Sequence, residues 1–235
     1  MYNFRTDLAD ERRDLFRQAN HLENEIPGVE AEEVEKSKYI KMNKVKITNE
    51  EGANAIGKPI GNYITFDLKY LHVAGDEEIQ SAAEAVSQEL KALIESKIQK
   101  ADDILIVGLG NEKVTPDSLG PRVVSKIDVT RHWFTYMPQL TDENTRPVSA
   151  VSPGVLGTTG IETQEILKGI VENVRPKLII VIDALASKSM ERISSTIQIA
   201  DTGIVPGAGV GNTRQELSQK TLGVPVIAIR CAYRG

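Results

Sequence analysis

The sequence predicts an α/β protein with three layers and a mostly parallel central sheet. Short runs that are apolar on both faces occupy residues 104–107, 178–182 and 224–229. Strands of this kind are typical of a parallel sheet covered by helices. The intervening stretches 118–127 and 161–174 supply candidate crossover helices, which parallel strands need in order to connect.

Further elements are expected before this region. The clearest helix covers residues 77–100, where apolar residues recur near the 3.6-residue spacing. Strands are expected around residues 45–47, where apolar and polar residues alternate, and over residues 61–68. Residues 1–38 are charged and carry too little apolar surface for a core of their own. We therefore interpret them as a docking arm or a removable leader that precedes an α/β domain over residues 39–229.

Composition narrows the class of protein. The chain has 235 residues, of which 40% are hydrophobic and 26% charged, with a formal net charge of −5. This balance suits a globular domain, and its acidity argues against binding to a nucleic-acid backbone. It does not argue against a basic protein as substrate. The single cysteine, Cys231, excludes an intrachain disulfide and a cysteine-rich zinc site.

Targeting signals are missing from the sequence pattern. The first residues lack the apolar core of a signal peptide, and no apolar run approaches the roughly 18 residues that would suggest a membrane span. The expectation is a cytoplasmic protein with no membrane partner.

Two aspartates follow predicted strands. Asp183 comes directly after the run 178–182, and Asp117 lies in the turn after 104–107, where a helix is expected to start. Because ligands gather at the carboxyl ends of strands in open α/β sheets, both carboxylates would open into one crevice if these strands are neighbours. Two close carboxylates share a proton, and such a pair can activate water against an amide without a metal or a covalent intermediate.

The same aspartates also have a structural interpretation. Asp117 could cap the N-terminus of a helix, and Asp183 could hydrogen-bond within a turn. Turn aspartates are common, so the spacing alone favours the structural roles.

Other short motifs are weaker. Residues 108–110 begin like a dinucleotide fingerprint, but Lys113 stands where the third glycine belongs. The glycines of residues 207–212 lack the ending of a phosphate-binding loop, so both segments are interpreted as tight turns. Asp201-Thr202-Gly203 matches the short signature of pepsin-like peptidases, yet those proteins are β-rich and an ordinary turn explains the triplet.

A metal site finds little support. The histidines His21, His72 and His132 are far apart, and no His-Glu-x-x-His pattern occurs. His132 could reach the crevice, although a partly buried histidine bonded to backbone is the more ordinary case. No metal and no cofactor are predicted.

Longer motifs occur in a fixed order along the chain, at residues 107–111, 114–121, 130–132, 146–150, 152–155, 159–163, 182–186, 201–204 and 206–212. In sequence and order they resemble the germination protease family of spore-forming bacteria, from about residue 4 to residue 229. The resemblance implies an endopeptidase that degrades small acid-soluble spore proteins at the start of germination, in the cytoplasm of the spore core. It also implies a tetramer, and a phosphorylase-like fold similar to that of the hydrogenase maturation proteases.

The resemblance extends to site residues. The proposed catalytic aspartates of the family correspond to Asp117 and Asp183. For both residues the resemblance therefore favours the catalytic interpretation over the structural one. No metal ligand set transfers to this chain. Family members are made as inactive zymogens, and the resemblance places autocleavage near the Asp7–Leu8 bond, with a propeptide of about residues 1–7.

The chain also departs from the family pattern. Family members continue past the last predicted strand with a helical C-terminal region, whereas residues 230–235 match nothing in the family and are interpreted as an aberrant tail. We therefore expect a truncated or frameshifted member, with part of an apolar sheet left uncovered. The alternative is a catalytically dead homologue that binds peptides or regulates. Nucleotide binding at the glycine turns is a more distant third hypothesis.

Overall fold

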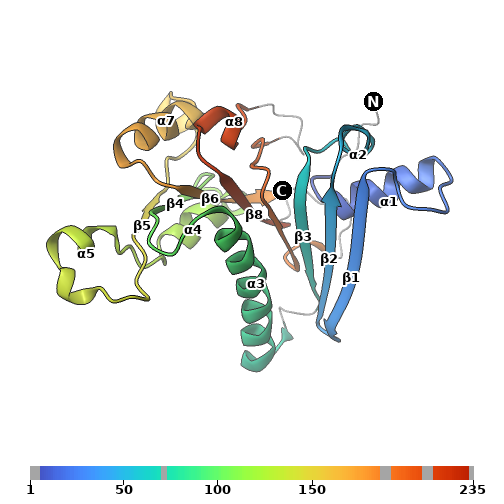
Figure 1. The fold of residues 1–235 in the computed structure, drawn as a ribbon, viewed down its shortest axis with the longest axis horizontal. Helices are drawn as coiled ribbons and strands as arrows, with labels where there is room; N and C mark the ends of the chain where they lie inside the picture. Colours follow the sequence, from blue (N-terminus) through green and yellow to red (C-terminus); the bar gives the residue numbers. More distant parts are fainter. Residues whose placement is uncertain (1–5, 70–72, 186–191, 208–213, 233–235) are drawn as a thin grey trace.

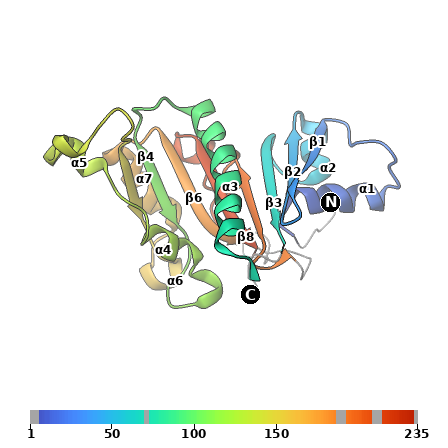
Figure 2. The same cartoon turned by 90° about the horizontal axis from the view of Figure 1, so that it is seen from below.

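A computed structural model describes residues 6–69, 73–185, 192–207 and 214–232. Within these ranges the chain forms one eight-stranded sheet in the order β1-β2-β3-β7-β8-β6-β4-β5, with helices on both faces (Figures 1 and 2). The strands are β1 (Val29–Ser37), β2 (Ile40–Ile47), β3 (Gly61–Leu68), β4 (Ile104–Gly108), β5 (Val148–Val151), β6 (Leu178–Leu185), β7 (Thr196–Ala200) and β8 (Val226–Ala232).

The sheet is mixed, and the prediction of a mostly parallel sheet is wrong. The expected parallel arrangement is confirmed for β8, β6 and β4, and β5 extends it. The pairs β1–β2, β2–β3, β3–β7 and β7–β8 are antiparallel and outnumber the parallel ones. The physical reason is that β7 returns beside β3, so the hairpin strands β1–β3 join the parallel strands through an antiparallel seam.

One face of the sheet is covered by α3 (Asp76–Lys97) and α4 (Leu119–Val124) (Figure 2). Ala82, Ala85 and Leu93 of α3 pack on apolar side chains from both halves of the sheet, including Phe66 and Ile180. The predicted helix over 77–100 is thus confirmed, and its buried positions recur at the spacing of a single helical face.

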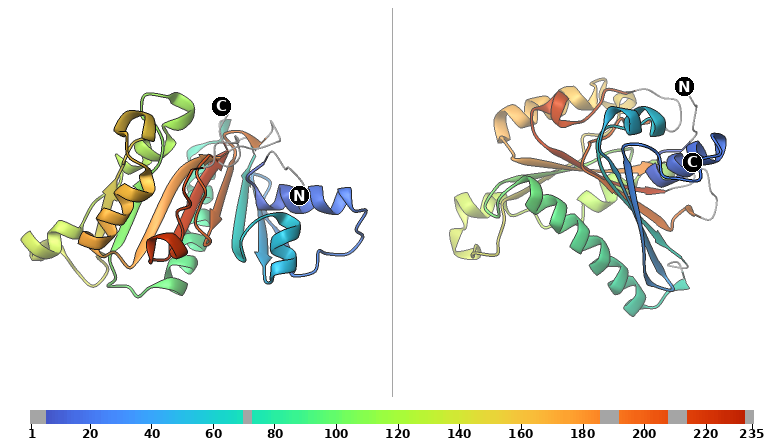
Figure 3. Two further views of the ribbon diagram at one scale, coloured as in Figure 1. Left: turned by 90° about the horizontal axis from the view of Figure 1, so that it is seen from above. Right: turned by 45° about the vertical axis from the view of Figure 1, so that its right-hand side comes forward.

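The opposite face carries α1 (Ala9–Ala19), α2 (Glu50–Ile56), α7 (Thr163–Val174) and α8 (Gln219–Leu222) (Figure 3). The first two lie over the hairpin strands, and the last two lie over the parallel strands, with separate apolar clusters beneath each pair. The remaining short helices are η2 (Thr115–Asp117), α5 (Arg131–Tyr136), η3 (Pro138–Leu140) and α6 (Leu156–Thr159).

Both chain ends contribute to this layered structure. Thr6, Leu8 and Ala9 are fully buried, and β1 pairs with β2 along its length although most of its side chains are exposed. At the other end, Arg230 and Cys231 continue β8 and pair in register with Asp183 and Ala184. None of the helices in the described ranges is long and apolar enough to cross a membrane.

A glycine allows α4 to approach the sheet closely. A Cβ at Gly120 would lie 2.3 Å from the Leu109 carbonyl oxygen and 2.6 Å from the Ile182 carbonyl oxygen. The helix therefore starts directly against the end of β4 and the C-terminal half of β6. The preceding η2, which contains Asp117, is brought to the same place.

We predict that Gly120→Ala lowers the free energy of unfolding by about 1–3 kcal/mol, because the added methyl group must displace backbone atoms. Gly169→Ala is the matched control: a Cβ there meets nothing within 4 Å, and the position lies inside α7. It should leave stability unchanged or raise it by about 0.5–1 kcal/mol. Urea denaturation measures both variants, and equal stability of Gly120→Ala and the wild type would contradict the close approach.

Candidate functional site

A row of polar residues crosses the middle of the sheet. Asp183 of β6 is the register partner of Arg230 of β8, Arg230 is the partner of Gln198 of β7, and Gln198 is the partner of Thr65 of β3. Partners in neighbouring strands project from the same face, and here it is the face covered by α1, α2, α7 and α8. All four residues are buried, so this row is a polar strip inside an otherwise apolar interface.

Asp117 reaches this face from the loop after β4. Its Oδ2 accepts a hydrogen bond of 2.8 Å from the Asn111 backbone N–H, which fixes the carboxylate against the turn. Gly110 makes this possible: its φ is +115°, and a Cβ there would lie 1.9 Å from the Asp117 carbonyl oxygen. The glycine turn at 108–110 is therefore a site of close backbone approach, as its sequence predicts.

The structure brings Asp117 and Asp183 to one cavity of about 210 Å³. Leu109 and Gly110 form one side, and the start of α7 with the loops around Gly154 and Gly207 forms the rest. Asp183 is not beyond the end of its strand, as the sequence pattern suggested, but inside β6, which extends to Leu185. The rule that ligands bind at the carboxyl ends of parallel strands still locates this cavity.

The two carboxylates differ in surroundings. Asp117 is half-buried, whereas only 7% of Asp183 is exposed. Burial raises the pKa of Asp183 to about 6; Arg230 opposes the shift, and the negative charge of Asp117 adds to it. Near neutral pH this carboxyl group can therefore bind and release a proton, as expected of an acid–base group.

The guanidinium of Arg230 connects Asp183 to the N-terminal segment. Its Nη2 donates to Asp7 Oδ2 at 2.9 Å and lies 3.7 Å from Asp183 Oδ2. Asp7 is 3% exposed, and Leu8 is fully buried against Leu185 at the end of β6. The Asp7–Leu8 bond that the sequence analysis marks thus lies beside the site residue Asp183.

Sequence reasoning missed Arg230. The signal was nevertheless present, because Arg230 follows the apolar run 224–229 as Asp183 follows the run 178–182. The strand-end rule that selected the aspartate also selects the arginine, once the two strands are known to be parallel neighbours.

Asp201 has a structural role. Its carboxylate accepts hydrogen bonds from the Asn62 backbone and side chain and pairs with Lys97 at 2.9 Å. Burial raises the pKa of Asp201, but these partners outweigh that effect and hold the pKa below its ordinary value. The residue joins β7 to β3 and α3 and does not line the cavity of Asp117 and Asp183.

The other weak motifs lie elsewhere. His132 is exposed on α5 and does not border this cavity. Residues 208–212 of the second glycine turn fall outside the described residues, although Gly207 lines the cavity. In the part of the chain that the structure describes, no three His, Cys, Asp or Glu side chains are grouped so that they could hold a metal ion.

Comparison with known proteins agrees with the sequence resemblance. The family model described as germination protease matches residues 6–232. The chain is 50% identical over 232 residues to a germination protease of Clostridium perfringens, which covers 97% of this chain and 69% of the relative. It is 52% identical over 225 residues to that of Caldanaerobacter subterraneus subsp. tengcongensis, covering 96% of this chain and 67% of the relative. The germination protease of Bacillus cereus is 47% identical over 230 residues, covering 97% of this chain and 62% of the relative.

Matches of this extent include β1 and α1 at one end and β8 at the other, so they apply to the whole sheet that carries Asp117, Asp183 and Arg230. The chain therefore belongs to the germination protease family and is a peptidase of spore germination.

Proposed function

We propose that Asp117 and Asp183 are the catalytic pair of this peptidase and activate water without a metal ion. The observation that carries the proposal is that both carboxylates line one cavity, and that one of them has its pKa raised to about 6. A shared proton between two carboxyl groups is the arrangement that water-activating acid–base hydrolysis of an amide needs.

The geometry suggests a division of roles. Protonated Asp183 donates its proton to the carbonyl oxygen of the scissile bond, while the Asp117 carboxylate accepts a proton from the attacking water. The water oxygen bonds to the carbonyl carbon and gives a tetrahedral intermediate. When the carbon–nitrogen bond breaks, Asp117 returns its proton to the leaving amine and Asp183 regains the proton of the former carbonyl oxygen.

The proposed substrates are small acid-soluble spore proteins, encountered in the cytoplasm of the spore core. Membership of the germination protease family supports this assignment. We also propose assembly into a tetramer. Exposed apolar side chains on and after α5, namely Phe134, Tyr136 and Leu140, support self-association, because large exposed apolar groups that gather on one segment favour an interface.

The N-terminal segment is proposed to be a propeptide that ends at Asp7 and is removed by autocleavage of the Asp7–Leu8 bond. The contact of Asp7 with Arg230, the neighbour of Asp183, supports this role. A segment held there occupies the side of the site that a substrate would approach, so the unprocessed chain would be latent.

Substituting either catalytic aspartate should remove activity. Asp117→Asn and Asp183→Asn are expected to lower kcat on a small acid-soluble spore protein by at least about 100-fold, the usual contribution of one acid–base group. Asp201→Asn is the matched control and should keep its activity, because Asp201 is held by Asn62 and Lys97 away from the cavity. Circular dichroism verifies folding, and undiminished cleavage by either of the first two variants would remove that residue from the mechanism.

Blocking autocleavage should trap the latent form. Asp7→Asn or Leu8→Pro is expected to leave a protein of unchanged mass with little activity on spore proteins, whereas the wild type shortens and gains activity. Intact mass spectrometry and a peptidase assay on the same sample measure both properties. Full activity from an uncleaved variant would refute the propeptide role.

The raised pKa of Asp183 also predicts a pH-dependent stability. The pKa of Asp183 in the folded protein, about 6, exceeds the ordinary value of 3.8, so ionisation of this carboxyl group destabilises the folded state. The destabilisation is complete above about pH 6 and absent below about pH 4. Asp183→Asn removes this destabilisation and keeps the Asp7–Arg230 pair. One pKa unit corresponds to about 1.4 kcal/mol. The free energy of unfolding of Asp183→Asn should therefore exceed that of the wild type by about 3 kcal/mol at about pH 8, and by about half as much at about pH 5. A gain that does not change with pH in urea denaturation would contradict the shift.

A further inference from the structure

The edge strand β5 leads toward the cavity of Asp117 and Asp183. It is the last strand in the sheet order, and among the described strands it pairs only with β4 (Figure 1). Its final residue, Val151, is level with the part of β4 next to the cavity, and residues 154 and 155 line the cavity itself. The open side of β5 therefore runs toward the place where the proposed reaction occurs.

The register of β4 and β5 determines which backbone groups of β5 face outward. The Ile104 N–H donates to the Pro147 carbonyl oxygen at 2.9 Å, and Ile104 is the register partner of Val148. In a parallel pair this pattern directs the N–H and C=O of Val148 away from β4. Because backbone groups alternate along a strand, the N–H and C=O of Ala150 also face outward.

The chain itself closes the first of these two positions. The Thr130 N–H donates to the Val148 carbonyl oxygen at 3.0 Å, and the Val148 N–H donates to Thr130 Oγ1 at 3.0 Å. The Thr130 hydroxyl in turn donates to the Arg146 carbonyl oxygen. Residues 130–132 and 146–150 form two of the ordered motifs that the catalytic pair does not use. In the structure they build the start of this edge.

The second position, Ala150, is open. No residue in the part of the chain that the structure describes donates to its carbonyl oxygen or accepts from its N–H on the outward side. All four residues of β5 are partly accessible. An edge with an unpaired donor and acceptor is a template for an added strand. The closed and the open position thus lie on one side of β5, and the open one is nearer the cavity.

The start of β5 is held rigidly. Arg146 donates to the carbonyl oxygens of Gln99 and Asp102 at 2.7 and 3.1 Å, so the segment before β5 is fixed to the turn before β4. Arg131 adds an ion pair of 3.2 Å with Asp103. These contacts keep the backbone of β5 in place before a partner arrives, which lowers the entropy that binding would otherwise cost.

We propose that the open edge of β5 at Ala150 binds the backbone of the protein substrate as an added strand and guides the substrate into the cavity of Asp117 and Asp183. This inference rests on the proposed peptidase function. In strand addition, main-chain hydrogen bonds supply the affinity whatever the side chains are. Here the Ala150 N–H donates to a carbonyl oxygen of the substrate, and the Ala150 carbonyl oxygen accepts from a substrate N–H.

The distance to the catalytic pair fixes where on the substrate this contact falls. A peptide added beyond β5 lies three strand spacings from β6, about 14 Å at about 4.8 Å each. Val151 and Val181 are both register partners of Val107, so Asp183 lies about three residues, or about 10 Å, further along the sheet than Ala150. The diagonal is about 17 Å, which about five or six residues of extended peptide cover.

The first test uses a variant of Ala150. Ala150→Pro removes the outward N–H and leaves the ladder with β4 intact, because proline is tolerated where the N–H of an edge strand faces away from the sheet. It should raise the KM of a peptide with about seven residues on each side of the cleaved bond about fivefold, the loss of one hydrogen bond. The KM of a peptide with three residues on each side, which does not reach β5, should stay unchanged. Ala150→Ser keeps the N–H and is the matched control. Equal KM values of Ala150→Pro and Ala150→Ser for the long peptide would overturn the proposal.

The second test uses the wild type and so does not depend on the folding of a variant. Each amide of the long peptide, except the one that is cleaved, is replaced in turn by an ester, which removes one N–H donor and adds no bulk. A replacement about five or six residues from the cleaved bond should raise KM about fivefold and leave kcat unchanged. If no ester at that distance raises KM, the substrate does not pair with β5 and the proposal is refuted.

A binding measurement separates this inference from the proposed function. A small acid-soluble spore protein that carries a fluorophore is titrated with Asp183→Asn, and its anisotropy gives Kd. Adding Ala150→Pro to this variant should raise Kd about fivefold, whereas adding Ala150→Ser should not change it. If the wild type cleaves no spore protein, the proposed function fails and this Kd still decides the docking edge. Equal Kd values for the two double variants would refute it.

A second copy of this chain is the competing occupant of the edge. Sedimentation velocity compares the oligomeric state of the wild type, Ala150→Pro and Ala150→Ser. An unchanged state together with a raised KM for the long peptide supports substrate docking. If Ala150→Pro instead lowers the oligomeric state and leaves the KM of the long peptide at the wild-type value, the edge pairs with another copy and substrate docking is refuted.

Discussion

One buried guanidinium, that of Arg230, links the N-terminal segment to the strand that carries Asp183. It contacts Asp7 from the N-terminal segment and approaches Asp183 from the neighbouring parallel strand. A buried charge is tolerated only when a partner compensates it, so the position of each of these groups depends on the others. The parallel register of β6 and β8, which sets Arg230 opposite Asp183, is therefore the constraint from which the site is built.

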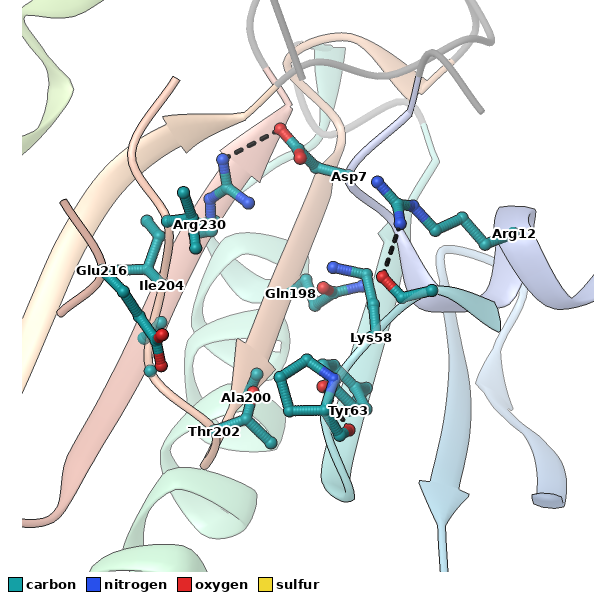
Figure 4. Close-up of a pocket in the computed structure, with 15 residues that line it drawn as sticks. Asp7, Arg12, Lys58, Tyr63, Gln198, Ala200, Thr202, Ile204, Glu216 and Arg230 are labelled. Carbon is teal, nitrogen blue, oxygen red and sulfur yellow. Dashed lines mark hydrogen bonds and ion pairs between the residues drawn. The ribbon is translucent and has the colours of Figure 1, made fainter. Parts of the chain in front are cut away.

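The mixed sheet explains why the site has two neighbouring cavities and not one. The parallel strands β4 and β6 end at the cavity of Asp117 and Asp183, as the rule for open α/β sheets requires. The antiparallel seam between β7 and β8 brings the hairpin strands and the N-terminal segment alongside. A second cavity, of about 170 Å³ and bordered by Arg12, Lys58 and Arg230, forms above that seam (Figure 4). A fully parallel sheet would not place Lys58 and Arg12 next to Arg230.

Much of this arrangement could be predicted from sequence, and the rest depended on long-range pairing. Apolar runs identified β4, β6 and β8, and periodicity identified α3, because burial on both faces or on one face leaves a local signature. The sequence pattern did not predict β1, because an edge strand whose side chains are mostly exposed has the composition of a charged loop segment. Pairing of β3 with β7 joins residues far apart in the chain, and no local pattern encodes it. The ends of the predicted strands were enough to identify Asp117 and Asp183 as candidate site residues. Arg230 could be identified only once β8 was known to lie beside β6.

Charge balance connects the N-terminal segment to the protonation state of Asp183 in the cavity that it shares with Asp117. Arg230 carries one positive charge and faces two carboxylates, so a proton on Asp183 brings the three groups to neutrality, and the charge of Asp7 itself contributes to the raised pKa of Asp183. Loss of Asp7 would leave Arg230 to compensate Asp183 alone and would favour its ionised form.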